Sequence, residues 1–435
     1  MKQSTMQADR LVSAKRTKNE RSGVHSWHPY YAGYAEMFVE TAIDYLKLTE
    51  RDIVLDPWNG SGTTSLVCGR RDINTIGFDV NEAMNIFSMA KSSFCLYSKD
   101  SIIQAGKDIS SELMNCQSMI DDKDPLLQFM SKSLCSGVRY LFSEIENYKF
   151  KNTELTPLFR NTFRSLRLQR TPEHCFLLSA LFTTARKLAG YKGGSNPTWI
   201  KTIDNKPPVK KSTLRNEFVK SLETMMDDLV STSIQSKQTL NNIALLGNSR
   251  NLSICNNSID AVITSPPYLT RIDYAMSTRP ELLILSDENS LRTTREATMG
   301  APVIVDKNIL ANKVWGNYCN SILKNVEGHS SKAAKSYYHT NMLQYFRDAE
   351  ESIREILRVL KSGSKALIVV QSSYFKELEI DLSKIYLEIA INLGADANIA
   401  FKEIVRGHMA HVNKKSNEYK SNKIFFESVV EITKR

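Results

Sequence analysis

Two short segments near the N-terminus restrict the fold of this chain more than any other feature. Residues 52–67 read DIVLDPWNGSGTTSLV, an apolar run that ends in an acid, followed by a glycine-rich turn and a helical pattern. Residues 73–84, INTIGFDVNEAM, form a second apolar run that also ends in an acid and leads into a helix. A strand, a loop, a helix and a second strand in this order are typical of a doubly wound α/β sheet. We therefore expect an α/β fold with a mostly parallel sheet.

The turn after the first strand has the features of a ligand-binding loop. Gly60 and Gly62 allow the backbone to approach a ligand closely, and the helix that follows offers unpaired amides at its N-terminus. The spacing matches neither the phosphate-binding P-loop nor a clean G-x-G-x-x-G. Asp56 suits a ligand that carries an ammonium or another positive charge better than it suits a phosphate. A tight turn without a ligand is the alternative interpretation.

The acid at the end of the second strand, Asp79, follows Asp56 by 23 residues. This offset is close to the roughly 20 residues at which a carboxylate accepts both ribose hydroxyls of an adenosine-type cofactor. Acids also commonly cap helices, and Asn81 and Glu82 could fill that structural role equally well.

The chain divides into segments with different patterns. Residues 1–22 are polar and basic without periodicity, which predicts a flexible arm. Residues 101–240 break the α/β rhythm with helical segments and a loop rich in Gly, Pro and Asn, which predicts a mainly helical insertion. The α/β pattern then resumes, so residues 23–100 and 241–435 are expected to form the main domain.

The C-terminal part supplies the rest of the predicted sheet. Apolar runs at 241–248, 258–268 and 365–373 predict buried strands, and residues 398–407 and 423–434 predict a closing pair of strands.

Three helices and one irregular stretch are expected around these strands. Helical spacing appears at 35–48, 339–363 and 382–395, and Ser362-Gly363 fits the C-terminal stop of the second of these helices. Residues 287–336 look irregular.

Charge and composition restrict the class of protein. The formal net charge is +10, and residues 160–220 alone hold thirteen Lys or Arg against three Asp or Glu. A local excess of this kind favours a polyanionic partner. The seven cysteines form no C-x-x-C pair, so we expect neither structural disulfides nor a metal site. No apolar run approaches the roughly 20 residues that cross a bilayer, and residues 1–23 lack the apolar middle of a signal peptide, so we expect a cytoplasmic protein without a membrane partner.

The strongest single motif is TSPPY at residues 264–268, directly after an apolar run. Two consecutive prolines hold the chain in a rigid, extended turn where a strand ends. Together with DPWNGSGTT (56–64) and GFDVNEA (77–83), this motif resembles the S-adenosylmethionine-dependent DNA amino-methyltransferases. Two further segments are similar to motifs of that family, namely HSWHPYY (25–31) and LRVLKSGSKALIVV (357–370).

The resemblance implies a Rossmann-like methyltransferase fold, S-adenosylmethionine as cofactor and double-stranded DNA as partner. The motif order, with the cofactor loop before the catalytic loop, differs from the family's permuted arrangement. The implied cofactor-binding residues are Tyr30, Asp56, Pro57, Trp58, Gly60, Gly62, Thr63, Thr64, Asp79, Val80, Asn248 and Ser265. The implied catalytic residues are Ser265, Pro266, Pro267 and Tyr268. Two departures from the family pattern are Trp58-Asn59 in place of Phe-Ala, and Asn248 in place of an acid.

The basic insertion is the candidate target-recognition region, expected to lie over the DNA cleft. Arg160, Arg164, Arg167 and Arg170 are spaced so that a helix would align them on one face. The DNA-binding candidates are Arg160, Arg164, Arg167, Arg170, Lys192, Lys201, Lys210, Lys211 and Arg271. Two further basic segments, RTTREATMG (292–300) and SKAAKSYY (331–338), lie near the catalytic edge. A solvated charged face is the alternative for any one of these residues.

The proline loop fits the chemistry that the resemblance implies. The lone pair of an exocyclic amino group is delocalised into the base, so methylation needs a flipped base and an amine drawn toward tetrahedral geometry. The Ser265 hydroxyl and the Pro266 carbonyl can accept the amine hydrogens while Tyr268 stacks on the base, and Asp56 can take the methionine ammonium. Methylation of cytosine C5 needs a cysteine nucleophile, which this loop lacks.

A serine in the loop favours cytosine N4 as the target, with adenine N6 as the close alternative. An RNA base N-methyltransferase and a DNA-binding module with a defunct site are the other hypotheses. A cognate restriction endonuclease or other defence-system components are possible partners.

Overall fold

The protein is described by a computed structural model. The described residues are 10–17, 19–29, 33–93, 98–116, 120–151, 153–163, 166, 168–191, 200, 204, 206–230, 239–269, 273–405 and 423–435.

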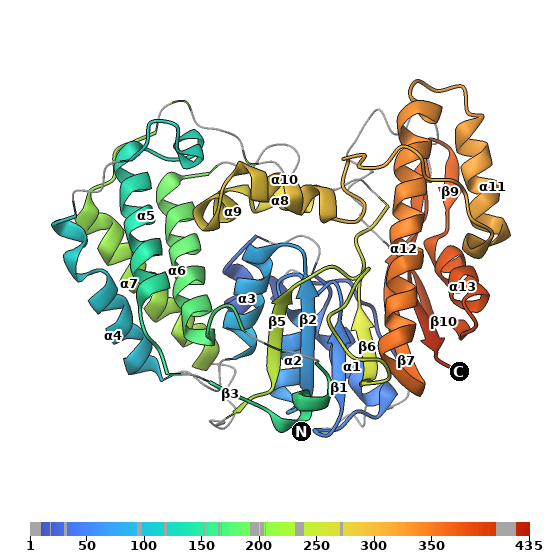
Figure 1. The fold of residues 1–435 in the computed structure, drawn as a ribbon, viewed down its shortest axis with the longest axis horizontal. Coiled ribbons are helices and arrows are strands. Elements are labelled where there is room, and N and C mark those ends of the chain that lie inside the picture. The colour runs from blue at the N-terminus through green and yellow to red at the C-terminus, as the bar shows by residue number, and fades with distance from the viewer. Residues whose placement is uncertain are drawn as a thin grey trace.

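A seven-stranded sheet forms the centre of the molecule, in the order β10-β11-β7-β6-β1-β2-β5 (Figure 1). The strands are β1 (Ile53–Asp56), β2 (Asn74–Asp79), β5 (Asn242–Leu246), β6 (Ile259–Thr264), β7 (Leu360–Gln371), β10 (Asp396–Val405) and β11 (Phe425–Thr433). The strands from β5 to β7 are parallel, whereas β11 runs antiparallel to both β7 and β10. The predicted Rossmann-like fold with a closing antiparallel pair is confirmed.

The strand order places a ligand crevice at one edge of the sheet. From β1 the chain moves outward to β2 and then to β5, and it returns to β6 on the other side of β1. Ligands of open α/β sheets bind outside the carboxyl ends of the strands at such a switch point. The glycine-rich turn follows β1 and the proline loop follows β6, so the two motifs meet at this point.

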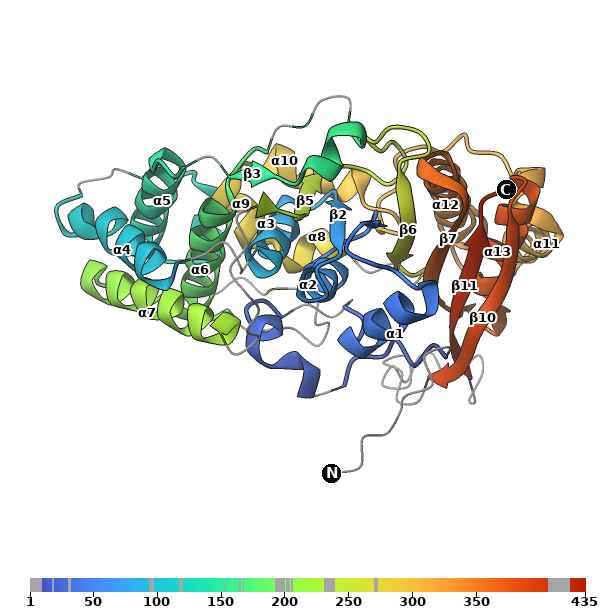
Figure 2. The same cartoon turned by 90° about the horizontal axis from the view of Figure 1, so that it is seen from below.

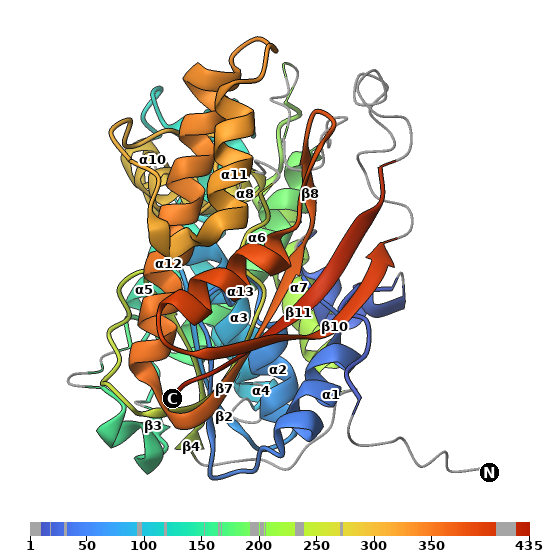
Figure 3. The ribbon, with the colours of Figure 1, turned by 90° about the vertical axis from the view of Figure 1, so that its right-hand side faces the viewer.

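Two apolar layers cover the sheet. One layer joins α1 (Glu36–Leu46) and α2 (Thr63–Arg70) to side chains of the central strands such as Ile263 and Val369. The other layer holds α3 (Glu82–Ser92), α12 (Thr340–Val359) and α13 (Leu382–Asn392). Figure 3 shows α13 across β10 and β11, which it contacts.

Four helices form a bundle beyond the β5 edge of the sheet (Figures 1 and 2). They are α4 (Lys99–Ile109), α5 (Lys132–Asn147), α6 (Pro172–Ala189) and α7 (Lys211–Val230). All four belong to the chain between β2 and β5, and α6 packs against α3 of the main domain. Buried residues of this bundle belong to the same apolar cluster as α3, so the bundle shares a core with the sheet domain.

A second excursion lies between β6 and β7, where an irregular stretch was expected. It contains α8 (Tyr274–Ser277), α9 (Arg279–Leu285), α10 (Glu288–Ala297) and α11 (Gly316–Glu327). The prediction of irregular structure over 287–336 is therefore wrong, because two helices of moderate length lie inside it. In Figure 1, α8 to α10 lie above the carboxyl ends of the strands, between the bundle and α12. Arg186 of α6 forms a bidentate ion pair with Glu281 of α9 at 2.8 Å, which ties the excursion to the bundle.

The other elements of the described residues are short strands and short helices. Short strands are β3 (Glu154–Leu155), β4 (Thr239–Leu240), β8 (Ser373–Phe375) and β9 (Leu378–Ile380). Short 3-10 helices are η1 (Asn19–Arg21), η2 (Gly23–Ser26), η4 (Ser111–Met114), η5 (Pro125–Gln128), η6 (Pro157–Asn161) and η7 (Lys313–Trp315), and η8 (Ala334–His339) is a π-helix. Across the described ranges, no helix combines the length and the hydropathy needed to cross a bilayer.

Two local expectations fail for identifiable reasons. The helix over 339–363 ends at Val359, and Ser362-Gly363 lie inside β7, where the Gly363 amide donates to the Lys434 carbonyl at 2.8 Å. The flexible arm is wrong for residues 10–17, because Leu11 and Ala14 are buried in the layer over α1. The Ala35 amide also donates to the Ala14 carbonyl at 2.8 Å, which fixes this segment to the start of α1.

Candidate active site

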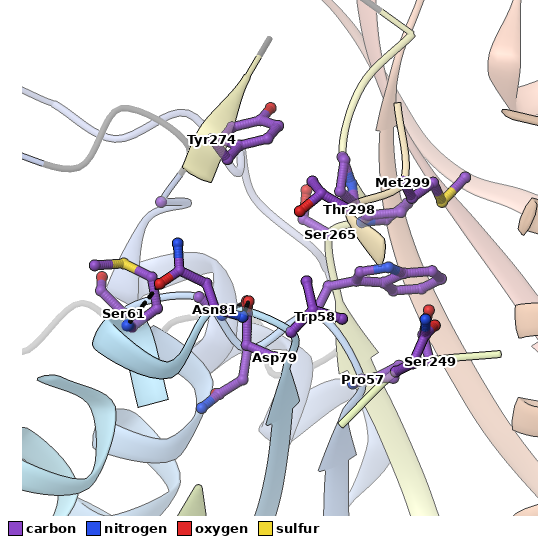
Figure 4. A pocket seen from close by; sticks show the side chains of 18 of the residues that line it. Pro57, Trp58, Ser61, Asp79, Asn81, Ser249, Ser265, Tyr274, Thr298 and Met299 are labelled. Atoms are coloured by element: carbon purple, nitrogen blue, oxygen red, sulfur yellow. Dashed lines mark hydrogen bonds between the residues drawn. The ribbon is translucent and has the colours of Figure 1, made fainter. Parts of the chain in front are cut away.

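A single pocket brings the two sequence motifs together at the carboxyl ends of β1, β2, β5 and β6. It encloses about 920 Å³, counting space that is open to solvent. This size is within the range of small-molecule sites. The glycine-rich turn and the proline loop face each other across it, and the end of α10 forms a third wall. Figure 4 shows Asp79 and Asn81 on one side, with Ser265, Thr298 and Met299 on the other.

Asp56 lies beneath the glycine-rich turn and does not line the pocket. Its carboxylate is 1% exposed and accepts four hydrogen bonds. The donors are Thr264 Oγ1 at 2.6 Å, Thr64 Oγ1 at 2.5 Å, the Trp58 amide at 3.1 Å and the Tyr34 hydroxyl at 3.2 Å. Burial raises the pKa of Asp56, and the bonds from Thr264 and Thr64 oppose that rise. In this geometry Asp56 ties β1 to β6 and to α2, and the interpretation that it takes an ammonium group directly is wrong.

The turn is held in a shape that only glycine adopts easily. Gly60 and Gly62 have φ values of 49° and 84°, and a Cβ on Gly62 would lie 2.3 Å from Ser88 Oγ. Asn59, the departure from the family pattern, is 4% exposed and donates from Nδ2 to Ser88 Oγ at 2.7 Å. The side chain at position 59 is therefore part of the turn's internal bonding.

Asp79 is the carboxylate that faces the pocket. Its Oδ2 accepts from the Gly60 amide at 2.9 Å, and its Oδ1 accepts from the Asn81 amide at 2.8 Å. Each oxygen of a carboxylate can accept a second bond. Burial raises the pKa of Asp79 to about 6, against the effect of these backbone donors. The Asn81 side chain caps α3 by accepting from the Met84 amide at 3.4 Å, which leaves Asp79 free of the capping role.

Asn248 lines the same side of the pocket, at the end of β5. Its Oδ1 accepts from the amide and from Nε of Arg250, both at 3.1 Å. Because both partners can only donate, the orientation of the amide is fixed, and Nδ2 is the group that Asn248 can offer to a ligand. The expectation that its oxygen accepts from an adenine amino group is wrong. Val80 and Met84 supply apolar surface beside it.

The proline loop is braced from behind by buried tyrosines. The Tyr345 hydroxyl donates to the Pro267 carbonyl at 2.9 Å and lies 3.4 Å from the Tyr386 hydroxyl. The Ser265 hydroxyl donates to the Val369 carbonyl at 3.3 Å. Ser265, Pro266, Pro267 and Tyr268 all line the pocket. The loop is thus preformed, as its prolines predict.

Four lining residues come from the helical part of the second excursion and were not among the sequence candidates. They are Tyr274, Thr298 and Met299, beside Ala297 at the end of α10. Figure 4 shows Tyr274 across the pocket from Met299, with the Trp58 side chain extending between Met299 and Ser249. Gly300, at φ 74°, lets the chain approach so closely that a Cβ there would lie 3.2 Å from the Tyr268 carbonyl. The basic character of RTTREATMG was the only sequence signal that pointed to this segment.

Positive charge lies directly behind the glycine-rich turn. Arg16 is 8% exposed, and its Nη2 donates to Thr63 Oγ1 at 2.9 Å and to the Tyr34 carbonyl at 3.2 Å. Lys91 is 1% exposed, and its Nζ donates to the Ser61 carbonyl at 3.3 Å. Burial and, to a smaller extent, the charge of Arg16 lower the pKa of Lys91 to about 7. These cations and the N-terminus of α2 favour an anionic group at this end of the pocket.

The remaining candidates from the sequence either line the pocket, lie away from it or fall outside the described residues. Pro57, Trp58 and Thr63 line the pocket, whereas Gly62 and Thr64 do not. Six candidates lie outside the described residues, namely Tyr30, Arg164, Arg167, Lys192, Lys201 and Arg271.

The basic segment between α5 and α6 is not the helix that was expected. Arg160 is exposed in η6, which ends at Asn161, and the described residues between η6 and α6 form no helix. Pro172 at the start of α6 also disfavours a helical conformation in the residue before it. Arg170 bonds Glu82 at 2.6 Å and Glu146 at 2.7 Å, so its guanidinium is held inside the protein.

Lys210 and Lys211, the two candidate lysines that the structure describes, differ in their contacts. Lys210 is exposed, and Lys211 Nζ donates to the Cys116 carbonyl. Within the described residues, no cluster of three or more His, Cys, Asp or Glu is arranged to hold a metal ion.

Comparison with known proteins agrees with these motifs. A family model described as a DNA methylase, of the N6 and N4 type, matches residues 12–88, which contain Arg16, the glycine-rich turn and Asp79. The type II methyltransferase M.BsoBI of Geobacillus stearothermophilus is 27% identical over 440 residues, covering 90% of this chain and 75% of that protein. The type II methyltransferase M.MjaII of Methanocaldococcus jannaschii is 39% identical over 75 residues, covering 17% of this chain and 13% of that protein.

The similarity to M.BsoBI extends through both excursions as well as the sheet. The family model over residues 12–88 and the meeting of the glycine-rich turn with the Ser-Pro-Pro-Tyr loop agree with this similarity. The chain is similar to the DNA amino-methyltransferases, the N6 and N4 DNA methylases, in its N-terminal motifs and, at 27% identity, over most of its length.

Proposed function

We propose that this protein transfers a methyl group from S-adenosylmethionine to the exocyclic amino group of a flipped base in double-stranded DNA, with cytosine N4 as the target. The observation that carries the proposal is the preformed Ser-Pro-Pro-Tyr loop, which faces the acid-bearing side of one pocket. The relatives are named as type II methyltransferases, which supports DNA as the substrate.

The pocket fits the cofactor that the family implies. Asp79 has acceptor capacity for two ribose hydroxyls, and Val80 and Met84 offer an apolar surface to an adenine ring. The Asn248 amide nitrogen can donate to a ring nitrogen of the adenine. Arg16 and the α2 N-terminus, close to Thr63, suit a carboxylate. When bound, the cofactor supplies an electrophilic methyl group.

The proline loop orients the amine that is methylated. Ser265 Oγ and the Pro266 carbonyl can accept the two amine hydrogens, which fixes the direction of the nitrogen lone pair. Tyr345 holds the Pro267 carbonyl, so the loop needs little ordering when the base arrives. Tyr268 and Tyr274 offer aromatic surface for the flipped base. Ala297, Thr298 and Met299 at the end of α10 form a wall beside the proline loop, which would limit the access of water to the bound amine.

The serine at position 265 supports cytosine N4 over adenine N6, since serine in this loop is more typical of the N4 group. Both targets present the same amine geometry, so adenine N6 is the second candidate. We further propose that the protein belongs to a restriction-modification or defence system with a cognate endonuclease, and that it acts on DNA in the cytoplasm.

The helical bundle, residues 101–240, is the proposed target-recognition region. It stands beside the pocket and is joined to the wall of the pocket through α9. Exposed Arg160 and Lys210 are its described candidates for phosphate contacts, which position DNA but do not specify sequence.

Mass spectrometry of nucleosides tests the proposal directly. Purified protein is incubated with methyl-labelled cofactor and unmethylated genomic DNA, or with total RNA in a parallel sample. We expect labelled N4-methylcytosine from DNA alone. Labelled N6-methyladenine would overturn the choice of base, and label in RNA alone would overturn the substrate class. Failure of the protein to bind the cofactor in calorimetry would favour a DNA-binding module with a defunct site.

A further inference from the structure

The side chain of Asn248 is held in one orientation at the edge of the pocket. Its Oδ1 accepts from the Arg250 amide and from Arg250 Nε, both at 3.1 Å. The Arg250 guanidinium is held in turn by buried Asp348, which accepts from Nη1 at 2.7 Å. An amide that turned over would present its NH2 group to two groups that can only donate. Nδ2 is therefore the polar atom of Asn248 that remains for a ligand.

The strand pairing places Asn248 beside Asp79. Leu246 is the partner of Asp79 in the register of β5 and β2, and the Gly247 amide donates to the Asp79 carbonyl at 3.1 Å. Asn248 is the next residue, and it lines the pocket together with Asp79 and Val80. In the proposed function Asp79 accepts from the ribose of the cofactor. Asn248 is then the side chain placed to contact the base of the same nucleoside.

An adenine base offers two kinds of polar group to such a contact. Its ring nitrogens accept hydrogen bonds, whereas its amino group at position six donates them. Nδ2 of Asn248 can only donate, so it can bond a ring nitrogen but cannot accept from the amino group. A carboxylate in this place would do the reverse, because it accepts from the amino group and repels an oxygen there. The residue at position 248 thus decides which substituent at position six the site can recognise.

We propose that Asn248 makes the cofactor site tolerant of the substituent at position six of the purine, so that a 6-oxo, inosine-type nucleoside binds about as tightly as an adenosine-type one. This inference rests on the proposed function, which places the nucleoside on Asp79. In the 6-oxo purine an oxygen replaces the amino group, and position one carries a hydrogen. Nδ2 can donate to that oxygen or to a ring nitrogen that both purines share, so its contact is kept in both ligands.

Calorimetry with two demethylated cofactor analogues tests this tolerance without any methyl transfer. The full chain is titrated at pH 8 with S-adenosylhomocysteine and, separately, with S-inosylhomocysteine. We expect the two dissociation constants of the wild type to agree within about tenfold. A preference for the adenosine compound of more than about tenfold would overturn the proposal.

Asn248→Asp is the variant that should introduce discrimination. Arg250 holds one carboxylate oxygen, and the other replaces Nδ2, where it accepts from the amino group and repels the oxo group. The ratio of the two dissociation constants should move in favour of the adenosine compound by at least about tenfold relative to the wild type. Asn251→Asp is the matched control. It makes the same change in charge at an exposed residue that does not line the pocket, so its ratio should equal that of the wild type.

Asn248→Ala provides a second variant that adds no charge to the site. It removes the donor from the contact, so it should weaken the binding of both compounds by a similar factor. A loss of affinity for only one of the two compounds would contradict a contact that both purines share.

The outcomes separate this inference from the proposed function. A wild type that methylates DNA but discriminates against S-inosylhomocysteine would overturn the tolerance and leave the methyl transfer intact. A folded Asn248→Asp variant with the wild-type ratio would overturn the role of Asn248. A wild type that binds neither compound and methylates no nucleic acid would overturn the proposed function, and this inference with it.

Discussion

Replacement of Asp56 by asparagine separates a structural role from a ligand-binding role for the acid of the glycine-rich turn. The carboxylate accepts bonds from Thr264 and the Trp58 amide on one oxygen, and from Thr64 and Tyr34 on the other. An asparagine can keep its oxygen toward the first pair, because an amide N–H can only donate. Its nitrogen then faces the two hydroxyls, which must rotate in order to accept.

The expected cost follows from these contacts. Two bonds to a charged acceptor are lost or reversed, at ~1.5–3 kcal/mol each. Part of this loss is offset, because the neutral amide avoids the burial penalty that raises the pKa of Asp56. We expect Asp56→Asn to lower the free energy of unfolding by about 2 kcal/mol in urea titrations, and cofactor affinity measured by calorimetry to change less than about threefold.

Asp381→Asn is the control for a buried acid far from the pocket. Asp381 is 6% exposed and accepts from the amide of Ser383 at 3.1 Å and from Lys402 at 2.8 Å. Both variants should lose stability, and neither should lose much cofactor affinity. A fall in affinity of more than about 30-fold in Asp56→Asn, with the unfolding free energy unchanged, would refute this reasoning. That result would mean that the carboxylate contacts the ammonium group of the cofactor after all.

Three further predictions concern the walls of the pocket. Ser265→Ala should reduce turnover by at least about tenfold with nearly unchanged cofactor affinity, measured by single-turnover kinetics and calorimetry; a collapse of cofactor binding would contradict its role at the amine. Tyr345→Phe leaves the Pro267 carbonyl without its donor, so stability should fall by about 1–3 kcal/mol and turnover should fall with it. Tyr318→Phe, which loses two bonds remote from the pocket, to the Glu379 carbonyl and from the Asp381 amide, should keep its turnover. Asp79 has a folded pKa of about 6, above its unfolded value, so ionisation costs stability as pH rises from about 4 to 6. The unfolding free energy of Asp79→Asn relative to wild type should therefore increase by about 3 kcal/mol between pH 4 and pH 7, and parallel pH curves in urea titrations would contradict this.

The sheet and its two loops follow from the sequence because buried parallel strands read as continuous apolar runs. The apolar parts of residues 53–56, 74–79 and 259–264 are such runs, and each ends in a polar residue at the ligand edge. The regular chain order then places the loops after β1 and β6 at one site. The helix predicted from the arginine spacing at 160–170 is absent from the described residues after η6. Most helical stability in proteins comes from an apolar face that packs on the core, and charged residues at helical spacing do not supply one.

The role of Asp56 could not be read from its motif, because its partners come from distant parts of the chain. Thr264 lies 208 positions away and Tyr34 lies 22 positions away, and only the fold brings their hydroxyls to this carboxylate. The role of Arg16 could not be predicted from the sequence for the same reason. Arg16 is one of several basic residues in a polar segment without periodicity, yet its guanidinium lies behind the glycine-rich turn once residues 10–17 pack on the sheet.

The same packing of residues 10–17 connects the glycine-rich turn to the antiparallel edge of the sheet. Arg16 donates to Thr63 at the glycine-rich turn, while Ser13 donates to Glu403 on β10. Removal of residues 1–9 leaves both contacts in place, whereas removal of residues 1–17 deletes them. The longer truncation should therefore weaken cofactor binding measured by calorimetry, and the shorter one should not. Equal affinity in the two truncated proteins would show that residues 10–17 do not support the pocket.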